Sequence, residues 1–222
     1  MSTLLIADDH PLFREALRGA VQRVMPGVNL HEADSVDALY ALVDAHPDAD
    51  LLLMDLNMPG AHGFNALVHL RALHPQLPVV IVSAREEPVV MRRALDHGAL
   101  GFIPKSADSD TIGQAIGAVL DGERWVPDEA HSAPATSRDE QETAQRLRDL
   151  TPQQFKVLQM LGAGRLNKQI AYDLGVSEAT IKAHVTAILR KLHVTNRTQA
   201  VLAAGRLAVD PDGLVLPPEE GE

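Results

Sequence analysis

Apolar residues in the first half of the chain gather in short runs, each followed by polar or turn-forming residues. The runs lie at residues 3–7, 28–33, 50–55, 78–83 and 100–104. Short apolar segments bounded by turn signals are typical of strands that are buried in a parallel sheet. Between the runs, apolar residues recur at i, i+3 and i+4, the spacing of an amphipathic helix. Five β-α units are therefore predicted, wound as an α/β domain around a five-stranded parallel sheet.

A different pattern follows the fifth unit. From Trp125 to about residue 138 the chain is rich in Pro, Ser, Ala, Asp and Glu. This composition is typical of a linker. A polar helix over residues 139–149 is an alternative for the last part of this segment.

Helical periodicity returns at Leu150 and predicts a second, all-α domain. Thr151 as N-cap, Pro152 at the first helical position and Gln154 three residues after the cap indicate a capping box. The predicted helices run from Pro152 to about Leu161, from Asn167 to Leu174, from Glu178 to about Leu192 and from Thr198 to about Ala208. A tight turn at Gly175 joins the second and third of them, so we expect a helix-turn-helix within a four-helix domain.

These patterns divide the chain into four parts. We expect a first domain over residues 1–122, a linker over 123–148, a second domain over 149–208 and a tail over 209–222. The tail combines three prolines with five acidic residues, a composition that predicts disorder.

Composition restricts the class of protein. The chain has 222 residues, 45% of them hydrophobic, which is enough for two ordinary domain cores. It contains no cysteine, so disulfides and thiolate zinc sites are excluded, and a reducing compartment is favoured. No basic segment precedes the first apolar run, and no run approaches the roughly 20 residues of a membrane span. We therefore expect a cytoplasmic protein with no membrane partner.

Charge is distributed unevenly along the chain. The formal net charge is −10, yet residues 151–208 hold eight bases and two acids, a balance of +6. The segments 1–120, 121–150 and 209–222 carry −7, −4 and −5. A local excess of basic residues is what contact with a phosphate backbone requires. The second domain is therefore the candidate for nucleic-acid binding.

Carboxylates stand where two predicted strands of the first domain end. Asp8 and Asp9 follow the first run, and Asp55 closes the third. Ligand sites of such sheets lie outside the carboxyl ends of the strands, so these side chains should meet. Crowded carboxylates repel one another unless a cation neutralises them, and an all-oxygen cluster suits Mg²⁺. The pattern predicts a metal-assisted phosphate site. His10 adjoins it, but no second histidine stands at ligand spacing, so a transition metal is not favoured.

Residues 3–121 resemble the receiver domain of two-component response regulators, which has a flavodoxin-like fold. Four strand ends carry the resemblance, in the right order. They are Ala7-Asp8-Asp9-His10-Pro11, Asp55-Leu56-Asn57-Met58-Pro59 with Gly63, Ser83-Ala84, and Phe102-Ile103-Pro104-Lys105. The resemblance implies that Asp55 is the phospho-acceptor and takes its phosphoryl group from a histidine kinase. It also implies that Asp9, Asp55 and the main-chain carbonyl of Asn57 hold Mg²⁺, with Asp8 acting through a metal-bound water.

The same resemblance assigns the conformational switch to three further residues. Lys105 complements the cation at the phosphoryl oxygens, and Ser83 donates a hydrogen bond to one of them. Phe102 swings inward and reshapes the face made by the fourth helix, the fifth strand and the fifth helix. Many members have Tyr at this position, and Phe102 lacks the hydroxyl that would report the inward state. Ordinary packing of Phe102 remains an alternative.

Residues 150–207 resemble the LuxR-type helix-turn-helix. The resemblance is carried by Leu150-Thr151-Pro152, Asn167-Lys168-Gln169-Ile170-Ala171, Leu174-Gly175-Val176-Ser177, Thr180-Ile181-Lys182-Ala183-His184-Val185 and Asn196-Arg197-Thr198. Along the helix from Glu178, one stripe is apolar, and another, with Ala179 and Arg190, is small, polar and basic. The outer stripe suits the major groove of double-stranded DNA.

Base-facing and phosphate-facing roles are distributed as follows. The family pattern and the stripe point to Lys182, Ala183 and Thr186 as base-facing. Phosphate contacts are expected from Lys168, Ser177, Thr180, Lys191 and Arg197, and Arg190 shares the DNA-binding stripe. RNA is disfavoured because the aromatic residues of the domain, Phe155 and Tyr172, have helical core spacing and offer no stacking platform.

The whole chain is thus identified as a NarL/FixJ-type response regulator and not as an enzyme. We expect DNA, a cognate histidine kinase and a second copy of the chain as partners, with RNA polymerase as a further candidate. A magnesium phosphohydrolase built on Asp55 is the enzyme alternative, but the haloacid-dehalogenase pattern requires an acid where Asn57 stands. A DNA binder that does not respond to phosphorylation is the other alternative; the set Asp8, Asp9, Asp55, Ser83 and Lys105 argues against it.

Overall fold

The computed structural model describes residues 2–61 and 63–209, and it divides into two compact units between Thr136 and Ser137. The acidic tail predicted from residue 209 lies, beyond Val209, outside the described residues. Within the part of the chain that is described, no helix is both long and apolar enough to cross a membrane.

The first unit is built on a five-stranded parallel sheet in the order β2-β1-β3-β4-β5. The strands are β1 (Thr3–Ala7), β2 (Asn29–Ala33), β3 (Leu51–Asp55), β4 (Val79–Ser83) and β5 (Gly101–Pro104). Each begins within one residue of its predicted position. Every residue of β3 and β4 is buried and their apolar runs are continuous, whereas β2, at the edge of the sheet, buries Ala33 alone. The predicted α/β fold is confirmed.

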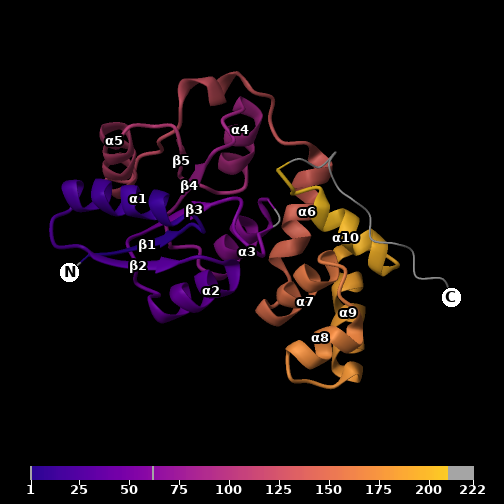
Figure 1. Ribbon diagram of the computed structural model, residues 1–222. Coiled ribbons are helices and arrows are strands. Elements are labelled where there is room, and N and C mark those ends of the chain that lie inside the picture. Colours follow the sequence, from indigo (N-terminus) through magenta and orange to yellow (C-terminus); the bar gives the residue numbers. More distant parts are fainter. Residues whose placement is uncertain (1, 62, 210–222) are drawn as a thin grey trace. The chain divides into compact units, whose positions relative to one another are not determined.

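Helices cover both faces of this sheet (Figure 1). They are α1 (Pro11–Val24), α2 (Val36–Ala45), α3 (Asn65–Leu73), α4 (Pro88–Asp96) and α5 (Ser109–Leu120). One core layer joins α1 and α5 to strand residues such as Leu4, Leu53 and Ile103, while α2, α3 and α4 lie on the opposite face. Because the strands are parallel, their carboxyl ends share one edge of the sheet, and this edge holds the site described below.

After α5 the chain returns to β5. We call residues 123–136 the strap. The Trp125 amide donates to the Leu100 carbonyl at 3.1 Å, and the Phe102 amide donates to the Trp125 carbonyl at 2.9 Å. A Cβ at Gly101 would lie 3.0 Å from the Trp125 carbonyl oxygen, so glycine permits this close approach.

The strap continues along α4. It contains a short 3-10 helix, η1 (Asp128–Ser132), which packs against α4 and buries Ala130 completely. At its end, both the amide and the hydroxyl of Thr136 donate to Asp96 Oδ2, at 2.9 and 2.8 Å. The first fourteen residues of the segment predicted as a linker are thus packed on the first unit, a contact that composition does not reveal.

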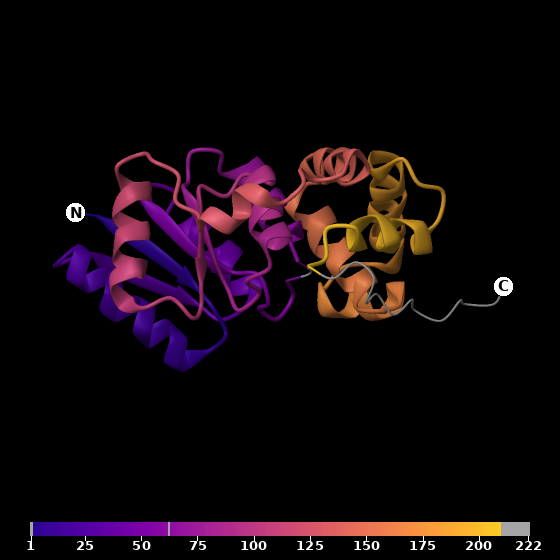
Figure 2. The same cartoon turned by 90° about the horizontal axis from the view of Figure 1, so that it is seen from above.

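Over its described residues, 137–209, the regular structure of the second unit is helical (Figure 2). Its helices are α6 (Arg138–Arg148), α7 (Pro152–Gly162), α8 (Asn167–Asp173), α9 (Glu178–Leu192) and α10 (Arg197–Gly205). The polar helix considered over residues 139–149 is α6; it packs against α9 and buries Leu147 completely. The capping box at Thr151 and Gln154 is formed in both directions. The predicted four-helix helix-turn-helix domain corresponds to α7 to α10.

Candidate functional site

The predicted carboxylate cluster forms at the carboxyl edge of the sheet. Asp8 follows β1, and Asp55 is the last residue of the neighbouring strand β3. Asp8 and Asp55 are 0% and 1% exposed, while the side chain of Asp9 is 29% exposed. Burial disfavours a carboxylate unless a cation or hydrogen-bond donors compensate it.

Lys105 supplies one such cation. It follows β5, and its Nζ lies 2.6 Å from Asp8 Oδ2 and 2.8 Å from Asp55 Oδ2. Burial favours the neutral amine, but the contacts with Asp55 and Asp8 outweigh it and raise the pKa of Lys105 above its usual value. The ammonium group therefore stays charged and holds together carboxylates that come from two different strands.

The same cluster also fits a divalent cation. One donor atom from each of Asp8, Asp9, His10 and Asp55 lies within 4.8 Å of the others. The buried oxygens Asp8 Oδ2 and Asp9 Oδ1 accept no well-directed hydrogen bond from the described residues, although Lys105 pairs with the first and His10 with the second. Carboxylate oxygens that remain available in a buried cluster are the donors that Mg²⁺ prefers.

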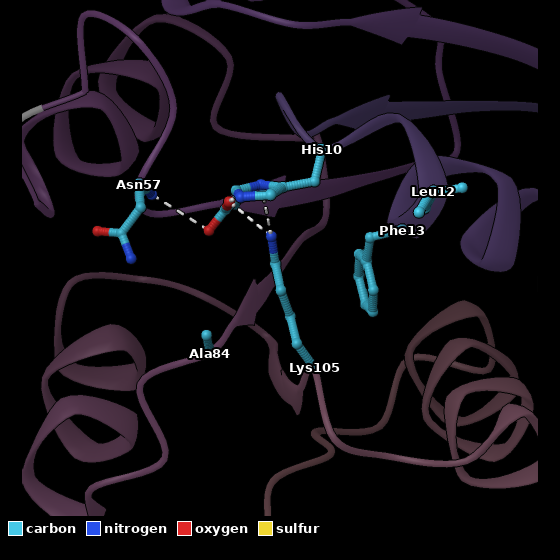
Figure 3. A pocket seen from close by; sticks show the side chains of 7 residues that line it. His10, Leu12, Phe13, Asn57, Ala84 and Lys105 are labelled. Atoms are coloured by element: carbon cyan, nitrogen blue, oxygen red, sulfur yellow. Dashed lines mark hydrogen bonds and ion pairs between the residues drawn. The ribbon is translucent and has the colours of Figure 1, made fainter.

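An open pocket gives access to this cluster (Figure 3). It is lined by His10, Leu12, Phe13, Asp55, Asn57, Ala84 and Lys105. Asn57 is exposed at its rim, and its main-chain N–H donates to Asp55 Oδ1 at 3.1 Å. Figure 3 shows the side chains of His10 and Lys105 directed toward the same point. A small anionic group can therefore reach Asp55 from solvent.

The two predicted switch residues on β4 and β5 are both fully buried. The Ser83 hydroxyl accepts a hydrogen bond from the Arg85 amide at 3.1 Å. The Phe102 ring is 0% exposed, which is the inward position expected of the switch. This burial also agrees with the alternative that Phe102 is an ordinary core residue.

Sequence reasoning placed His10 beside the site without naming its contacts, and it did not identify Phe13 and Arg14, two residues of α1 that complete the site. Arg14 donates to the Asp8 carbonyl at 2.6 Å and pairs with Glu32 on β2. The Phe13 ring lies 4.9 Å from Lys105 Nζ, a cation–π contact. His10 Nδ1 lies 2.8 Å from Asp9 Oδ1. Helical spacing predicts that one face of α1 is buried, but it does not predict which of its residues reach the strand ends.

The second candidate site lies on α9. Its predicted outer stripe, Ala179, Lys182, Ala183, Thr186 and Arg190, is exposed throughout. Ser177 is the N-cap of the helix: its hydroxyl oxygen accepts a hydrogen bond from the Thr180 amide at 3.1 Å. This bond connects the turn to the first turn of the helix that carries the stripe. Lys182 pairs with Glu178 at 3.1 Å, and the Thr186 hydroxyl donates to the Lys182 carbonyl. These contacts stay within α9, and the side chains remain exposed to solvent, where a partner surface can reach them.

Two of the predicted phosphate contacts already bind groups inside their own domain. Lys191 Nζ donates to the Asp149 carbonyl and to Gln154 Oε1, both at 2.7 Å. The Arg197 guanidinium donates to the Arg165 carbonyl at 2.7 Å. Lys191 therefore connects α9 to the start of α7, and Arg197 connects α10 to the segment that follows α7. Neither role was apparent from the sequence.

Tyr172 differs from its predicted environment. Helical spacing placed it in the core, but its side chain is 87% exposed on α8, whereas Phe155 is buried as expected. The buried face of α8 is formed by Ile170 and Ala171, and Tyr172 lies outside this narrow face. Lys168 is exposed one turn earlier on the same helix.

Two family models match the chain. A model of the response regulator receiver domain matches residues 4–117, and a model of the luxR family of bacterial regulatory proteins matches residues 148–204. Together they account for the sheet with its carboxylate cluster and for the helices around α9.

Characterised proteins align with both parts at once. The chain is 44% identical over 211 residues to the glycerol metabolism activator of Pseudomonas putida, across 92% of this chain and 96% of that protein. It is 32% identical to the nitrate/nitrite response regulator protein NarL of Escherichia coli K12, across 90% of this chain and 94% of NarL. Salmonella enterica serovar Typhimurium RcsB, solved bound to promoter P1flhDC with the phosphomimetic BeF3−, has a similar fold. Its TM-score is 0.54 at 24% identity, over 91% of this chain and 97% of RcsB.

Proposed function

Because this chain belongs to the response regulators that join a receiver domain to a luxR-family DNA-binding domain, we propose that phosphorylation of Asp55 controls its binding to DNA. Members of this family are transcriptional regulators and not enzymes. Asp55 takes the phosphoryl group from a histidine kinase, and the receiver passes the change to the DNA-binding domain.

The observation that carries this proposal is the ion-pair cluster of Asp8, Asp55 and Lys105. An aspartate can accept a phosphoryl group only where fixed positive charge offsets the incoming oxygens. Here Asp55 is buried at the floor of an open pocket, with the Lys105 ammonium 2.8 Å from its Oδ2. An isolated surface aspartate would lack both the access path and the compensating charge.

Mg²⁺ is the cation proposed for this cluster. Asp9, Asp55 and the main-chain carbonyl of Asn57 would hold it, with Asp8 acting through a water. When bound, the ion offsets the charge of the phosphoryl oxygens as they approach Asp55. Lys105 then exchanges its contact with Asp55 for a phosphoryl oxygen, which is a short movement because its Nζ already lies in the pocket.

The switch follows from the same rearrangement. Ser83 turns its hydroxyl from the Arg85 amide to a phosphoryl oxygen, and this movement draws in the loop after β4. The expected inward swing of Phe102 is not part of this proposal, because Phe102 already lies buried on β5 and holds that position while the loop moves. The face of α4, β5 and α5 changes shape as a result.

DNA is read by the exposed stripe of α9. Lys182, Ala183 and Thr186 face the bases, and Arg190 extends the same stripe. Lys168, Ser177 and Thr180 contact phosphates, which fix the register of the helix in the groove. Lys191 and Arg197 are proposed as phosphate contacts too, in addition to the contacts they make inside the domain.

The active form is proposed to be a homodimer in the cytoplasm. One short helix makes few base contacts, so two copies on paired half-sites are needed for tight specific binding. RcsB has been solved as two dimers bound to two parallel DNAs. The relative of 44% identity is named an activator, which favours activation of transcription, with RNA polymerase as a further partner.

The test is phosphorylation by a small phosphodonor in the presence of Mg²⁺, followed by DNA binding to a selected site. Asp55 should be labelled, and Asp55→Asn should be neither labelled nor able to respond in the binding assay. Labelling of the variant to the same extent as the parent would refute the acceptor assignment. Labelling of Asp55 without any change in DNA affinity would instead support a receiver that does not control the DNA-binding domain.

A further inference from the structure

The imidazole of His10 lies among the carboxylates of the phosphorylation site. Its Nδ1 is 2.8 Å from Asp9 Oδ1, 3.3 Å from Asp8 Oδ1 and 3.9 Å from Asp55 Oδ2. Figure 3 shows the ring extending from the start of α1 to a position beside the end of the Lys105 side chain. None of the roles assigned so far uses this nitrogen.

These distances match the spacing of ligands around a single ion. With bonds of about 2.1 Å, neighbouring ligands of an octahedral cation lie about 3 Å apart and opposite ligands about 4.2 Å apart. The three distances from His10 Nδ1 fall between 2.8 and 3.9 Å, and the four donor atoms lie within 4.8 Å of one another. A nitrogen donor and carboxylate oxygens therefore lie within reach of one ion, beside the Lys105 ammonium, whose Nζ is 3.5 Å from His10 Nδ1.

The backbone brings the ring to this place. The His10 amide donates to Asp8 Oδ1 at 2.7 Å, and Pro11 begins α1 at once, so the main chain of His10 is fixed on both sides. The side chain is 63% exposed, which leaves the cluster open to an ion from solvent. Little reorganisation is required before Nδ1 can coordinate.

We infer that His10 Nδ1 is a ligand of the proposed metal site and gives it a preference for nitrogen-binding first-row cations such as Ni²⁺ over Mg²⁺. Imidazole suits Co²⁺, Ni²⁺ and Zn²⁺, whereas carboxylates and carbonyls suit Mg²⁺. The inference rests on the proposed metal site and goes beyond it, because it adds a ligand and a selectivity. From the sequence alone a transition metal was not favoured, because no second histidine stands at ligand spacing. We propose one here because the single histidine lies among carboxylates, and nitrogen and oxygen donors together suit a first-row cation.

The experiment is calorimetric titration of the tag-free full-length protein with MgCl2 and, separately, with NiCl2, at about pH 8, where ordinary imidazoles are neutral. The quantity compared is the ratio of the two affinities in each variant, because carboxylates alone also bind Ni²⁺ more tightly than Mg²⁺. In His10→Gln the ratio should fall by about tenfold or more, with the Mg²⁺ affinity nearly unchanged.

His74→Gln is the matched control. His74 also lies beside a carboxylate, 3.5 Å from Asp44 Oδ1, but it stands at the end of α3 outside the cluster. The ratio in this variant should equal that of the parent. Equal thermal unfolding midpoints for all three proteins will show that the affinities refer to the same fold.

A second readout identifies the atom. In protein carrying ¹⁵N-labelled histidine, Zn²⁺ should shift the Nδ1 resonance of His10 and leave its Nε2 resonance in the range of a non-coordinating nitrogen. An unchanged ratio in His10→Gln, an equal loss for both ions, or an equal gain for both would each overturn the inference. An equal gain would show that the ring merely competes with the ion as a cation.

The outcomes can be separated from those of the proposed function. If Asp55 is labelled with Mg²⁺ and the affinity ratio does not depend on His10, the inference fails and the proposed function stands. If Asp55 is not labelled but the ratio falls in His10→Gln, the metal site stands and the phosphorylation assignment fails.

Discussion

At the scale of single residues, Lys105 is the position where one change should have the clearest effect. Lys105→Met removes the ammonium and leaves Asp8 and Asp55 buried beside each other without compensation. We expect a loss of about 2–4 kcal/mol in the free energy of unfolding without divalent ions. Saturating Mg²⁺ should recover much of it, and thermal unfolding with and without MgCl2 will measure this. Equal destabilisation under both conditions would contradict the placement of Lys105 beside the proposed metal site.

The pKa of Lys105 also fixes a pH dependence. Because the contacts in the fold raise this pKa above 10.5, its stabilisation is complete below that pH. The stabilisation is lost as the pH rises through the folded-state pKa. Unfolding of the parent at alkaline pH should therefore show a decline that Lys105→Met lacks.

Thr136 offers a second residue-scale test, at the end of the strap. Burial acts to raise the pKa of Asp96, but the amide and hydroxyl of Thr136 together with Arg92 lower it below 3.8. The resulting stabilisation is present above that pH and is lost on acidification. Thr136→Val removes the hydroxyl and should cost about 1 kcal/mol. The pKa of Asp96, followed by NMR, should rise in this variant.

Ser132→Ala is the control for this change. It also removes a strap hydroxyl, one that donates only to the Glu129 carbonyl within η1. The pKa of Asp96 should not move in this variant. A shift of the same size in both variants would mean that the strap acts on Asp96 as a whole and not through Thr136.

At the scale of elements, α9 carries both the surface proposed to read DNA and the contacts of Lys191 with Asp149 and Gln154 at the start of α7. Lys191→Ala should lower the free energy of unfolding by about 1 kcal/mol, because it breaks the contacts with Asp149 and Gln154. Arg190→Ala changes an exposed residue in the same turn and should lower DNA affinity alone. Urea unfolding and DNA titration at two salt concentrations will separate the two effects. If neither variant is destabilised, the contact of Lys191 with α7 does not contribute to the free energy of unfolding.

Elements with strong local signals were predictable from the sequence. The strands β1, β3 and β4 could be placed because continuous apolar runs are required where a sheet is covered on both faces. The start of α7 was predictable because Thr151, Pro152 and Gln154 satisfy the backbone of one helix turn by themselves. The carboxylate cluster followed from parallel strands ending at one edge.

Other features depend on contacts between distant segments and have no local signal. The strap has the composition of a linker. Its contacts with β5 and α4 could not be predicted from it, because these elements are distant in the sequence. Tyr172 has core spacing, yet α8 is only seven residues long and buries a narrow face. His10 was expected beside the cluster because it follows Asp8 and Asp9, but its approach to Asp55 and Lys105 has no local signal, since these residues stand at the ends of β3 and β5.

At the scale of the whole molecule, the structure changes which fragment should form the more stable DNA-binding domain. The +6 charge lies in residues 151–208, but the preceding helix α6 also belongs to the fold: it packs on α9, and Arg146 donates to the Leu192 carbonyl. We therefore expect fragment 137–208 to unfold at a higher temperature than fragment 149–208. Both should bind DNA with strong salt dependence. Circular dichroism melting and fluorescence anisotropy will measure this. Equal melting temperatures would show that α6 is dispensable for the domain.

The pairing of Trp125 with β5 has a consequence for solubility. β5 is the last strand of the sheet, and an uncovered edge strand is a template for pairing with other chains. The Trp125 backbone occupies the Leu100 carbonyl and the Phe102 amide on that edge. A receiver cut after residue 122 would expose both groups, whereas one that extends to Thr136 keeps them paired. The shorter fragment should self-associate on size-exclusion chromatography, and the longer one should elute as a monomer before phosphorylation.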